Sequence, residues 1–319
     1  MKNLLVTGAL GFVGSNFVKY VSKNYGSKYN IVILDKVTYA ADISNLSNVK
    51  VGNLYICDIC DMDKVEKIIR TEKIDEIVHF AAESHVDSSI KNPFIFMQTN
   101  AMGTQSMLEA ARRVWGENSD NRFVYISTDE VYGSLGDFGY FTENSKLAPN
   151  SPYSSSKASA DLIARSYFST YNMNICITRS SNNYGPNQHV EKLIPHMIDL
   201  ALKDKKLPVY GNGLNVRDWI YVKDNCKAIF KVLRYGKKGE VYNIGSNNER
   251  TNLEIVKFIL KTLGKDESLI TFVEDRKAHD YRYALDSSKI KLELLWKPEV
   301  SFEEGMIYTI NHYVEKFKK

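Results

Sequence analysis

Long apolar segments are absent from this chain of 319 residues, although 44% of its residues are hydrophobic. The first apolar run, within Met1–Gly8, is far shorter than the hydrophobic core of a signal peptide. No later segment approaches the roughly 20 apolar residues that a membrane-spanning helix needs. The sequence therefore predicts a cytoplasmic protein that does not bind a membrane.

Cysteine is also scarce, with four residues in the whole chain. So few cysteines predict no disulfide framework, as is usual in a reducing compartment. Cys57 and Cys60 have the spacing of a zinc-binding pair, but no second cysteine pair or histidine pair accompanies them. We therefore expect no metal site and interpret this segment as a strand end followed by a loop.

No block of like charges, internal repeat or low-complexity tract occurs. The net charge is +4 and the isoelectric point is near 8.6, but the lysines and arginines are scattered. This pattern does not indicate nucleic-acid binding. It is sufficient for a mildly basic cleft that accepts an anionic small molecule.

Strand-like and helix-like segments alternate through the first 180 residues. Helical segments begin near Phe12, Asp61, Pro93 and Pro152, and strict alternation is typical of a doubly wound, Rossmann-like parallel sheet of the α/β class. Residues 1–180 are therefore predicted to form an NAD-binding domain, and residues 181–319, which are richer in Gly/Asn turns, a smaller α/β region that mainly binds a nucleotide sugar. The predicted strands are 3–7, 30–35, 53–57, 76–80, 122–127 and 174–179.

A glycine-rich loop follows the first predicted strand. Gly8, Gly11 and Gly14 would permit a tight turn, let the backbone approach a pyrophosphate, and place that group at a helix N-terminus. Asp35 ends the second strand, where a carboxylate binds the adenosine ribose and repels a 2′-phosphate, so NAD is favoured over NADP. Further positions predicted to line the cofactor are Phe12, Val13, Lys36, Thr38, Asp58, Ile59, Ala81 and Ala82.

A tyrosine and a lysine share one face of a predicted helix. Tyr153 and Lys157 are four residues apart, so both side chains project from the same side. An ammonium near a phenol favours the phenolate, and a nicotinamide cation acts in the same direction. We therefore expect Tyr153 to act as a base, with Lys157 in support, and we expect both to contact the cofactor.

An acidic pair follows the fifth predicted strand. Thr128 precedes Asp129 and Glu130 at a carboxyl strand end, where ligands bind in parallel sheets. Two carboxyl groups in one cleft do not both ionise easily, which separates their pKa values and lets one act as acid and the other as base. The alternative is a polar turn or helix N-cap without a chemical role.

Taken together, these motifs resemble the dTDP-glucose 4,6-dehydratase family of extended short-chain dehydrogenase/reductases. The glycine spacing G-x-x-G-x-x-G is one that this larger family uses, and the likeness runs essentially from end to end. Related epimerases and decarboxylases share the loop and the Tyr/Lys pair but lack the acidic pair. The segments that carry the resemblance are Ser127-Thr-Asp-Glu-Val-Tyr-Gly133, Pro152-Tyr-Ser-Ser-Ser-Lys-Ala158, Ala81-Ala-Glu-Ser-His-Val-Asp87, Asn182-Asn-Tyr-Gly-Pro186 and Asn215-Val-Arg-Asp-Trp219.

The resemblance implies a role for each matching residue. Tyr153 would assist oxidation at C4 of the hexose, Glu130 would take the C5 proton, and Asp129 would protonate the departing C6 hydroxyl before a hydride returns to C6. It also implies bound NAD, a nucleotide-sugar substrate, and a homodimer formed through helices near Pro93–Trp115 and Tyr153–Tyr171. The remaining implied contacts are Thr99 and Asn183 to the cofactor, and Ser84, His85, Thr128, Asn182, Glu191, Lys192, Pro208, Tyr210, Arg217, Asn252, Arg276 and His279 to the substrate.

Three departures from the family pattern are visible. Ala9-Leu10 stands where Gly-Ala is expected, Arg276-Lys-Ala-His279 replaces Arg-Pro-Gly-His, and Val190 replaces a common proline. The last two changes fall in the predicted nucleotide pocket and leave thymine and uracil both open as the preferred base. His85 could contact the sugar or cap a helix. The alternative functions are a UDP-glucose 4,6-dehydratase, a sugar-nucleotide epimerase or decarboxylase, and a non-catalytic NAD-sensing regulator.

Overall fold

A seven-stranded parallel sheet forms the centre of the computed structural model, which describes residues 1–116 and 119–318. The strand order is β10-β6-β5-β4-β1-β2-β3, and every pairing in this sheet is parallel. This topology confirms the predicted doubly wound α/β class. The strands are β1 (Lys2–Thr7), β2 (Tyr29–Asp35), β3 (Leu54–Ile56), β4 (Glu76–His79), β5 (Arg122–Thr128), β6 (Ile175–Ser180) and β10 (Val241–Ile244).

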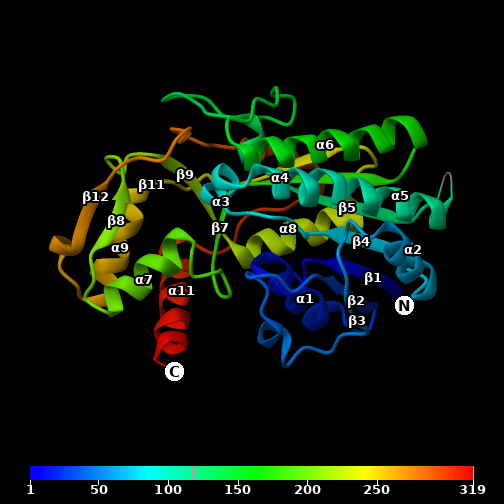
Figure 1. Ribbon diagram of the computed structural model, residues 1–319, viewed down its shortest axis with the longest axis horizontal. Coiled ribbons are helices and arrows are strands. Elements are labelled where there is room, and N and C mark those ends of the chain that lie inside the picture. The colour runs from blue at the N-terminus through cyan, green and yellow to red at the C-terminus, as the bar shows by residue number, and fades with distance from the viewer. Residues whose placement is uncertain (117–118, 319) are drawn as a thin grey trace.

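Helices cover both faces of this sheet, as Figure 1 shows. One face packs against α1 and α8, and the other packs against α2, α5 and α6. Each face of the sheet packs on its helices through a separate cluster of buried apolar side chains. The strands are covered on both faces, and so they carry apolar residues on both faces. The helices are α1 (Phe12–Tyr25), α2 (Met62–Thr71), α3 (Val86–Lys91), α4 (Pro93–Phe96), α5 (Gly103–Trp115), α6 (Pro152–Tyr171) and α8 (Val222–Tyr235).

The six predicted strands are confirmed to within one residue at each end. The helix starts predicted at Phe12, Pro93 and Pro152 are confirmed, and Asp61 is the N-cap of α2. Short segments complete this part of the chain. They are the 3-10 turns η1 (Ile43–Leu46) and η3 (Asp129–Tyr132), and the π-helical η2 (Met97–Met102) between α4 and α5.

The chain after β6 builds a smaller cluster at one end of the sheet, on the left in Figure 1. This cluster has its own apolar core, formed mainly by α7, α9 and α11 with the neighbouring short strands. Not all of the later chain belongs to it, because β10 pairs with β6 at the edge of the large sheet and α8 covers one face of that sheet. The division at residue 180 remains a prediction. The elements are β7 (Asn182–Tyr184), α7 (Leu193–Leu202), β8 (Leu207–Tyr210), β9 (Val216–Tyr221), β11 (Glu249–Thr251), α9 (Asn252–Leu263), η4 (Glu267–Leu269), β12 (Ile270–Val273), α10 (Ser288–Leu294) and α11 (Phe302–Phe317).

The start of α6 is fixed by local sequence. Ser151 and Ser154 form a reciprocal capping box, and Pro152 occupies the first turn, where its missing N–H costs no hydrogen bond. The helix ends at Asn172, which adopts the left-handed conformation. These signals place Tyr153 and Lys157 on the first two turns of a well-defined helix.

None of the helices formed by residues 1–116 and 119–318 combines the length and the apolar character needed to cross a lipid bilayer.

Candidate active site

A cavity of about 340 Å³ opens at the carboxyl ends of the parallel strands. Because those ends share one edge of the sheet, loops from distant parts of the chain meet there. The predicted catalytic residues, all the predicted cofactor residues and five predicted substrate residues line it. They are Gly8, Gly11, Phe12, Val13, Gly14, Asp35, Lys36, Thr38, Asp58, Ile59, Ala81, Ala82, Ser84, Thr99, Thr128, Asp129, Glu130, Tyr153, Lys157, Asn182, Asn183, Glu191 and Lys192.

Two of the three loop glycines are required by the backbone itself. Gly8 has a φ of +64°, and a Cβ there would lie 2.6 Å from the backbone nitrogen of Ala81. A Cβ on Gly14 would lie only 2.2 Å from the carbonyl oxygen of Gly8. A Cβ on Gly11 meets no atom of the protein closer than 3.4 Å. Gly8 and Gly14 therefore shape the turn, whereas Gly11 leaves space on the ligand side.

Asp35 anchors this loop. Its carboxylate accepts hydrogen bonds from the backbone N–H of Leu10 at 3.0 Å and of Val37 at 2.8 Å. The side chain is thus positioned at the strand end as predicted, but it also holds the glycine loop against β2. Beside it, Lys36 and Asp58 form an ion pair at 2.6 Å.

The predicted base and its lysine lie side by side in the protein interior. Tyr153 is 9% exposed and Lys157 is 5% exposed. Lys157 donates a hydrogen bond to the carbonyl of Ile126 at 2.6 Å and lies over the ring of Tyr125. Burial lowers the pKa of Lys157 to about 7, and the negative charge of Asp161 partly opposes this.

The protein alone does not favour the Tyr153 phenolate. Burial raises the pKa of Tyr153 well above its usual value, and the nearby charges of Glu130 and Asp129 act in the same direction. A hydrogen bond with Thr128 opposes the increase. The sequence argument that Lys157 makes Tyr153 a base at neutral pH therefore requires a further positive charge in the cavity, such as that of a nicotinamide ring.

The two carboxyl groups differ in their surroundings. Burial raises the pKa of Asp129 well above its usual value, and the charge of Glu130 adds to this effect. Burial also raises the pKa of Glu130, but the positive charges of Arg276, Arg217 and Lys192 oppose it. These surroundings favour the protonated form more strongly at Asp129 than at Glu130.

Thr128 lies at the junction of these groups. Its hydroxyl donates to Asp129 Oδ1 at 3.1 Å and accepts from the backbone N–H of Glu130 at 3.3 Å. Asp129 Oδ2 is buried and has no hydrogen-bond partner in the described protein. A buried carboxylic acid with one oxygen unpaired is available to a ligand.

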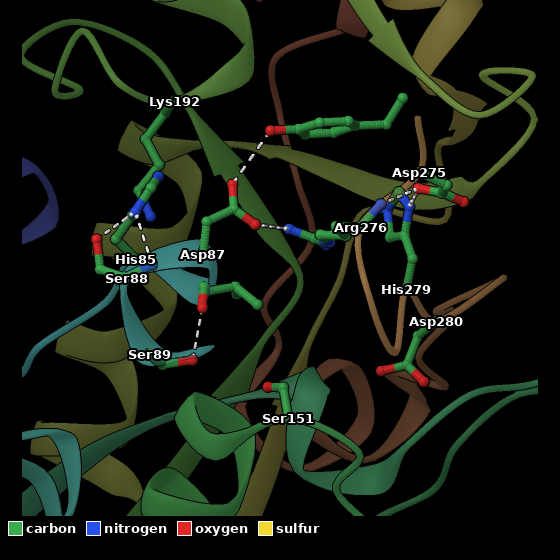
Figure 2. A network of polar contacts seen from close by, with 12 residues as sticks. His85, Asp87, Ser88, Ser89, Ser151, Lys192, Asp275, Arg276, His279 and Asp280 are labelled. Carbon is green, nitrogen blue, oxygen red and sulfur yellow. Dashed lines mark hydrogen bonds and ion pairs between the residues drawn. The ribbon is translucent and has the colours of Figure 1, made fainter. Parts of the chain in front are cut away.

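Arg276 and His279, which the resemblance implies for the substrate, lie outside the cavity lining, in the polar network of Figure 2. Asp87 accepts a hydrogen bond from Tyr210 Oη at 3.4 Å and lies 3.9 Å from Arg276 Nη1. His279 Nδ1 lies 2.6 Å from Asp275 Oδ1, and its ring packs edge-on to Tyr210. In this way α3 of the large sheet region contacts β8 and the segment after β12.

Arg217, which the resemblance implies for the substrate, makes most of its contacts within the protein. It is 4% exposed and packs over the ring of Tyr283. Its guanidinium donates to the carbonyls of Val216 at 2.7 Å, Asp280 at 2.8 Å and Tyr281 at 3.2 Å. A role for Arg217 in diphosphate binding stays a prediction. Pro208 lies in β8 and Asn252 at the start of α9, also outside the main cavity.

His85 is the N-cap of α3. Its Nδ1 accepts a hydrogen bond from the backbone N–H of Ser88 at 3.3 Å and lies 2.8 Å from the Ser88 hydroxyl (Figure 2). Of the two alternatives weighed from the sequence, the structure shows the capping interaction, and contact with a sugar stays untested.

Several residues that line the cavity were not identified from the sequence. Asn225 of α8 is 1% exposed, donates to Asn183 Oδ1 at 2.7 Å and accepts from the Ser180 hydroxyl at 2.9 Å. The backbone of Glu83 is held by the amide of Asn100. No local motif marks these positions, because their contacts span many residues of sequence. Further lining residues of this kind are Ser127, Ser181, Gln188 and His189.

The departures from the family pattern have structural consequences. Ala9 and Leu10 are almost fully buried in the apolar core below the loop, so the larger side chains are absorbed by packing. Ala278, which stands where glycine is expected, has a φ of +51°. That conformation is unfavourable for a residue with a Cβ. Val190 is 42% exposed and packs in neither core.

The cavity fits a dinucleotide by several observations. The tight turn made by Gly8 and Gly14 places the N-terminus of α1 at the cavity, where a pyrophosphate is favoured. Asp35 marks the adenosine end, and Tyr153 marks the other end of the same cavity. Ser127 Oγ and Asn182 Oδ1 are buried there with no hydrogen-bond partner within residues 1–116 and 119–318.

Comparison with known proteins agrees with this geometry. Residues 5–309 match the family model for GDP-mannose 4,6 dehydratase. The chain belongs to the GDP-mannose 4,6 dehydratase family. The dTDP-glucose 4,6-dehydratase of Haemophilus influenzae is 44% identical over 98% of both chains. The low-salt glycan biosynthesis protein Agl12 of Haloferax volcanii is 49% identical, also over 98% of both.

Solved structures of similar proteins support the same assignment. DesIV, a dTDP-glucose 4,6-dehydratase from Streptomyces venezuelae solved with NAD and TYD bound, has a TM-score of 0.94 at 45% identity and covers 99% of this chain and 98% of its own. A UDP-glucose 4-epimerase from Thermotoga maritima has a TM-score of 0.91 at 27% identity, with 99% of each chain covered. The resemblance to dTDP-glucose 4,6-dehydratases is confirmed, while the fold alone does not separate dehydratases of this family from epimerases.

The glycine loop leads to a first prediction. Gly14→Ala is expected to displace the loop, because its Cβ would collide with the Gly8 carbonyl, and so to lower the melting temperature of the cofactor-free protein. Gly11→Ala is expected to leave that temperature almost unchanged and to weaken NAD binding alone. Thermal unfolding and calorimetric NAD titration of both variants test this. Equal destabilisation by the two substitutions would contradict it.

The buried acid leads to a second prediction. The pKa of Asp129 is raised in the folded state, so the folded state retains a proton that the unfolded chain releases at its ordinary pKa. Stability is therefore lost as pH rises from the unfolded pKa towards the folded one, by about 1.4 kcal/mol per pH unit. Asp129→Asn removes this effect and is expected to be more stable than the wild type, increasingly so above about pH 4.

Urea unfolding at a series of pH values measures this difference in stability. The exposed Glu315→Gln serves as the control and is expected to follow the wild-type curve. A difference between Asp129→Asn and wild type that stays constant with pH would show that Asp129 ionises normally in the folded protein.

Proposed function

We propose that this protein is an NAD-dependent dTDP-glucose 4,6-dehydratase, a hydro-lyase that forms dTDP-4-keto-6-deoxyglucose. The observation that carries the proposal is the acidic pair formed by buried Asp129 and half-buried Glu130, in the same cavity as Tyr153 and Lys157. Oxidation of an alcohol needs only the Tyr/Lys pair and a hydride acceptor. A protonated acid beside a carboxylate base supplies what is needed to remove water.

The residues divide the reaction between them. Tyr153 takes the proton of the C4 hydroxyl through its phenolic oxygen, and Lys157 supports it with positive charge. The resulting ketone acidifies C5, from which Glu130 takes a proton. Asp129 gives its proton to the C6 hydroxyl, which leaves as water. Glu130 then returns a proton to C5 as C6 is reduced.

NAD, when bound, supplies the acceptor for the hydride of C4 and the donor that returns it to C6. Gly8, Gly11 and Asp35 would hold its pyrophosphate and adenosine ribose. The cofactor therefore ends in its starting oxidation state and is retained.

The substrate end is cationic. Lys192, Arg217 and Arg276 are close enough to Glu130 to oppose the rise in its pKa, and they form a suitable environment for a diphosphate. The names of relatives that are 43–45% identical favour a thymine nucleotide. UDP-glucose is the competing substrate, because Ala278 and Val190 differ from the family pattern in this region.

An epimerase is the second candidate, because epimerases of this fold reach TM-scores of 0.89–0.91. Epimerisation does not require a buried acid next to a base, and so this function is less favoured. A non-catalytic NAD-sensing regulator gives no reason for Tyr153 and Lys157 either.

The protein is also proposed to be a cytoplasmic homodimer. An apolar surface lies on α4, η2 and α6, the helices that the family resemblance implies for the interface. Phe94 is 74% exposed, Met102 63% and Leu162 52%. Large apolar side chains gathered on one face are typical of an association site.

A third prediction separates oxidation from elimination. Glu130→Gln is expected to suppress incorporation of solvent deuterium at C5, and Asp129→Asn to slow water loss, each by about 10²–10⁴-fold. Both variants should still reduce bound NAD on mixing with dTDP-glucose. Tyr153→Phe should abolish that reduction. Absorbance of bound NADH and mass spectrometry of the sugar measure the steps.

Wild-type protein assayed with dTDP-glucose and UDP-glucose in parallel completes this experiment. Keto-sugar formation from dTDP-glucose at the higher kcat/KM supports the proposal, and the reverse order would reassign the substrate. If both acid-pair variants form product at the wild-type rate, Asp129 and Glu130 have no chemical role and the epimerase is favoured.

A fourth prediction concerns the dimer. Phe94→Glu combined with Met102→Glu is expected to yield monomers, because charges would be buried in the apolar interface. Leu292→Glu, at a 76% exposed position on α10, should leave the dimer intact. Sedimentation velocity distinguishes the two species. A dimeric double variant, or a monomeric wild type, would contradict the proposed interface.

A further inference from the structure

The catalytic residues are carried by two separate elements. Asp129 and Glu130 lie in the short turn η3, while Tyr153 and Lys157 lie on the first two turns of α6. If Tyr153 serves oxidation and the acidic pair serves elimination, both elements must keep a constant position relative to one substrate. An error of about 1 Å in such an arrangement can cost as much as 10²-fold in rate.

A buried arginine connects the two elements. Arg179 of β6 is 5% exposed and binds Asp161 of α6 through two parallel hydrogen bonds of 2.9 and 2.7 Å. Its Nη1 donates to the hydroxyl of Tyr132, the last residue of η3, at 2.8 Å. The guanidinium also lies over the Tyr132 ring, 4.9 Å from its centroid.

The Tyr132 hydroxyl has a second partner. It donates to Asn243 Oδ1 at 2.8 Å, so both hydrogen-bonding capacities of the phenol are used in a site with no access to water. Asn243 belongs to β10, and its backbone N–H donates to Glu143 at 2.9 Å. The end of η3 is thus tied to two neighbouring strands, β6 and β10, and through Arg179 to α6.

The two elements depend on this network to different degrees. Helix α6 has further attachments to the sheet, including the hydrogen bond from Lys157 to Ile126 and the packing of its buried face. Turn η3 is four residues long. Val131 and Tyr132 pack in one apolar cluster with Ala158 of α6, and Val131 accepts one backbone bond from Ala148. The Tyr132 hydroxyl adds hydrogen bonds to Asn243 and Arg179.

A buried ion pair is weak evidence for added stability, because desolvation of both charges offsets their attraction. A bidentate Arg–carboxylate pair does restrict orientation, since the planar guanidinium binds in one geometry. The use of charged groups at this position is therefore better explained by geometry than by stability.

We propose that Arg179, Asp161 and Tyr132 are positioning residues that set the place of the acidic pair on η3 relative to Tyr153 on α6. The inference rests on the proposed dehydratase function and deepens it. The network acts on the elimination step through Tyr132.

The experiment uses Tyr132→Phe in the NAD-loaded, full-length protein. This variant retains the ring and loses the hydroxyl that joins Arg179 to Asn243. Reduction of bound NAD by dTDP-glucose is expected to stay within about twofold of wild type, while C5 deuterium incorporation and water loss slow about tenfold or more. Bound NADH and the 4-keto sugar that has not yet lost water should therefore accumulate.

Three further variants keep the test decisive. Arg179→Lys retains the charge but loses the fork, so it is expected to slow elimination in the same way. The double variant should be no slower than the slower single variant, because both act through one contact. Tyr242→Phe is the matched control: it also removes a buried hydroxyl on β10, yet its partners Lys237 and Glu293 lie away from η3.

The outcomes distinguish this inference from the proposed function. Wild-type protein that forms no keto sugar from either nucleotide sugar would overturn the function, and the positioning role with it. Wild-type activity together with equal slowing of oxidation and elimination in Tyr132→Phe would overturn the positioning role alone. So would the same loss in Tyr242→Phe, or additive effects of the two network substitutions.

Discussion

Parallel hydrogen bonding across the central sheet is the constraint on which the site depends. Strands β1, β2, β4, β5 and β6 all run in one direction, so their carboxyl ends reach one edge together. The glycine loop, Asp35, the segment after β4 and the acidic turn come from positions up to more than a third of the chain apart, and they meet only for this reason. An antiparallel pairing would send alternate loops to the opposite edge.

Burial then gives these groups unusual acid–base properties. Removing Asp129, Glu130 and Tyr153 from water raises the pKa of each, because the charged form loses its hydration. Cations from the later part of the chain reduce this effect mainly at Glu130. The chemical distinction between two adjacent carboxyl groups therefore arises from their neighbours and not from the side chains themselves.

The same scaffold supports more than one reaction. Epimerases share the fold with TM-scores close to those of dehydratases, and so the fold does not decide the chemistry. The decision lies in the residues that follow β5 and in how firmly they are held. In this protein Tyr132 and Arg179 connect that turn to the helix that carries Tyr153. Buried contacts therefore link the two halves of the site.

The sequence by itself determined the elements and the local parts of the site. Apolar runs located six strands to within one residue, and helix start signals located α1, α2, α4 and α6. Tyr153 and Lys157 could be paired because four residues make one helical turn, and Asp129 and Glu130 because they are adjacent. The glycines of the loop likewise have a spacing that can be read directly.

Only the tertiary structure decided the contacts between distant segments. The join of β10 to β6, the bonds from Arg217 to the carbonyls of Asp280 and Tyr281, the hydrogen bond between Asn225 and Asn183, and the bond from Arg179 to Tyr132 all connect residues tens of positions apart. No periodicity marks such pairs. The pKa shifts belong to the same class, because each depends on water excluded and charges approached in three dimensions, and neither quantity is a property of a short stretch of sequence.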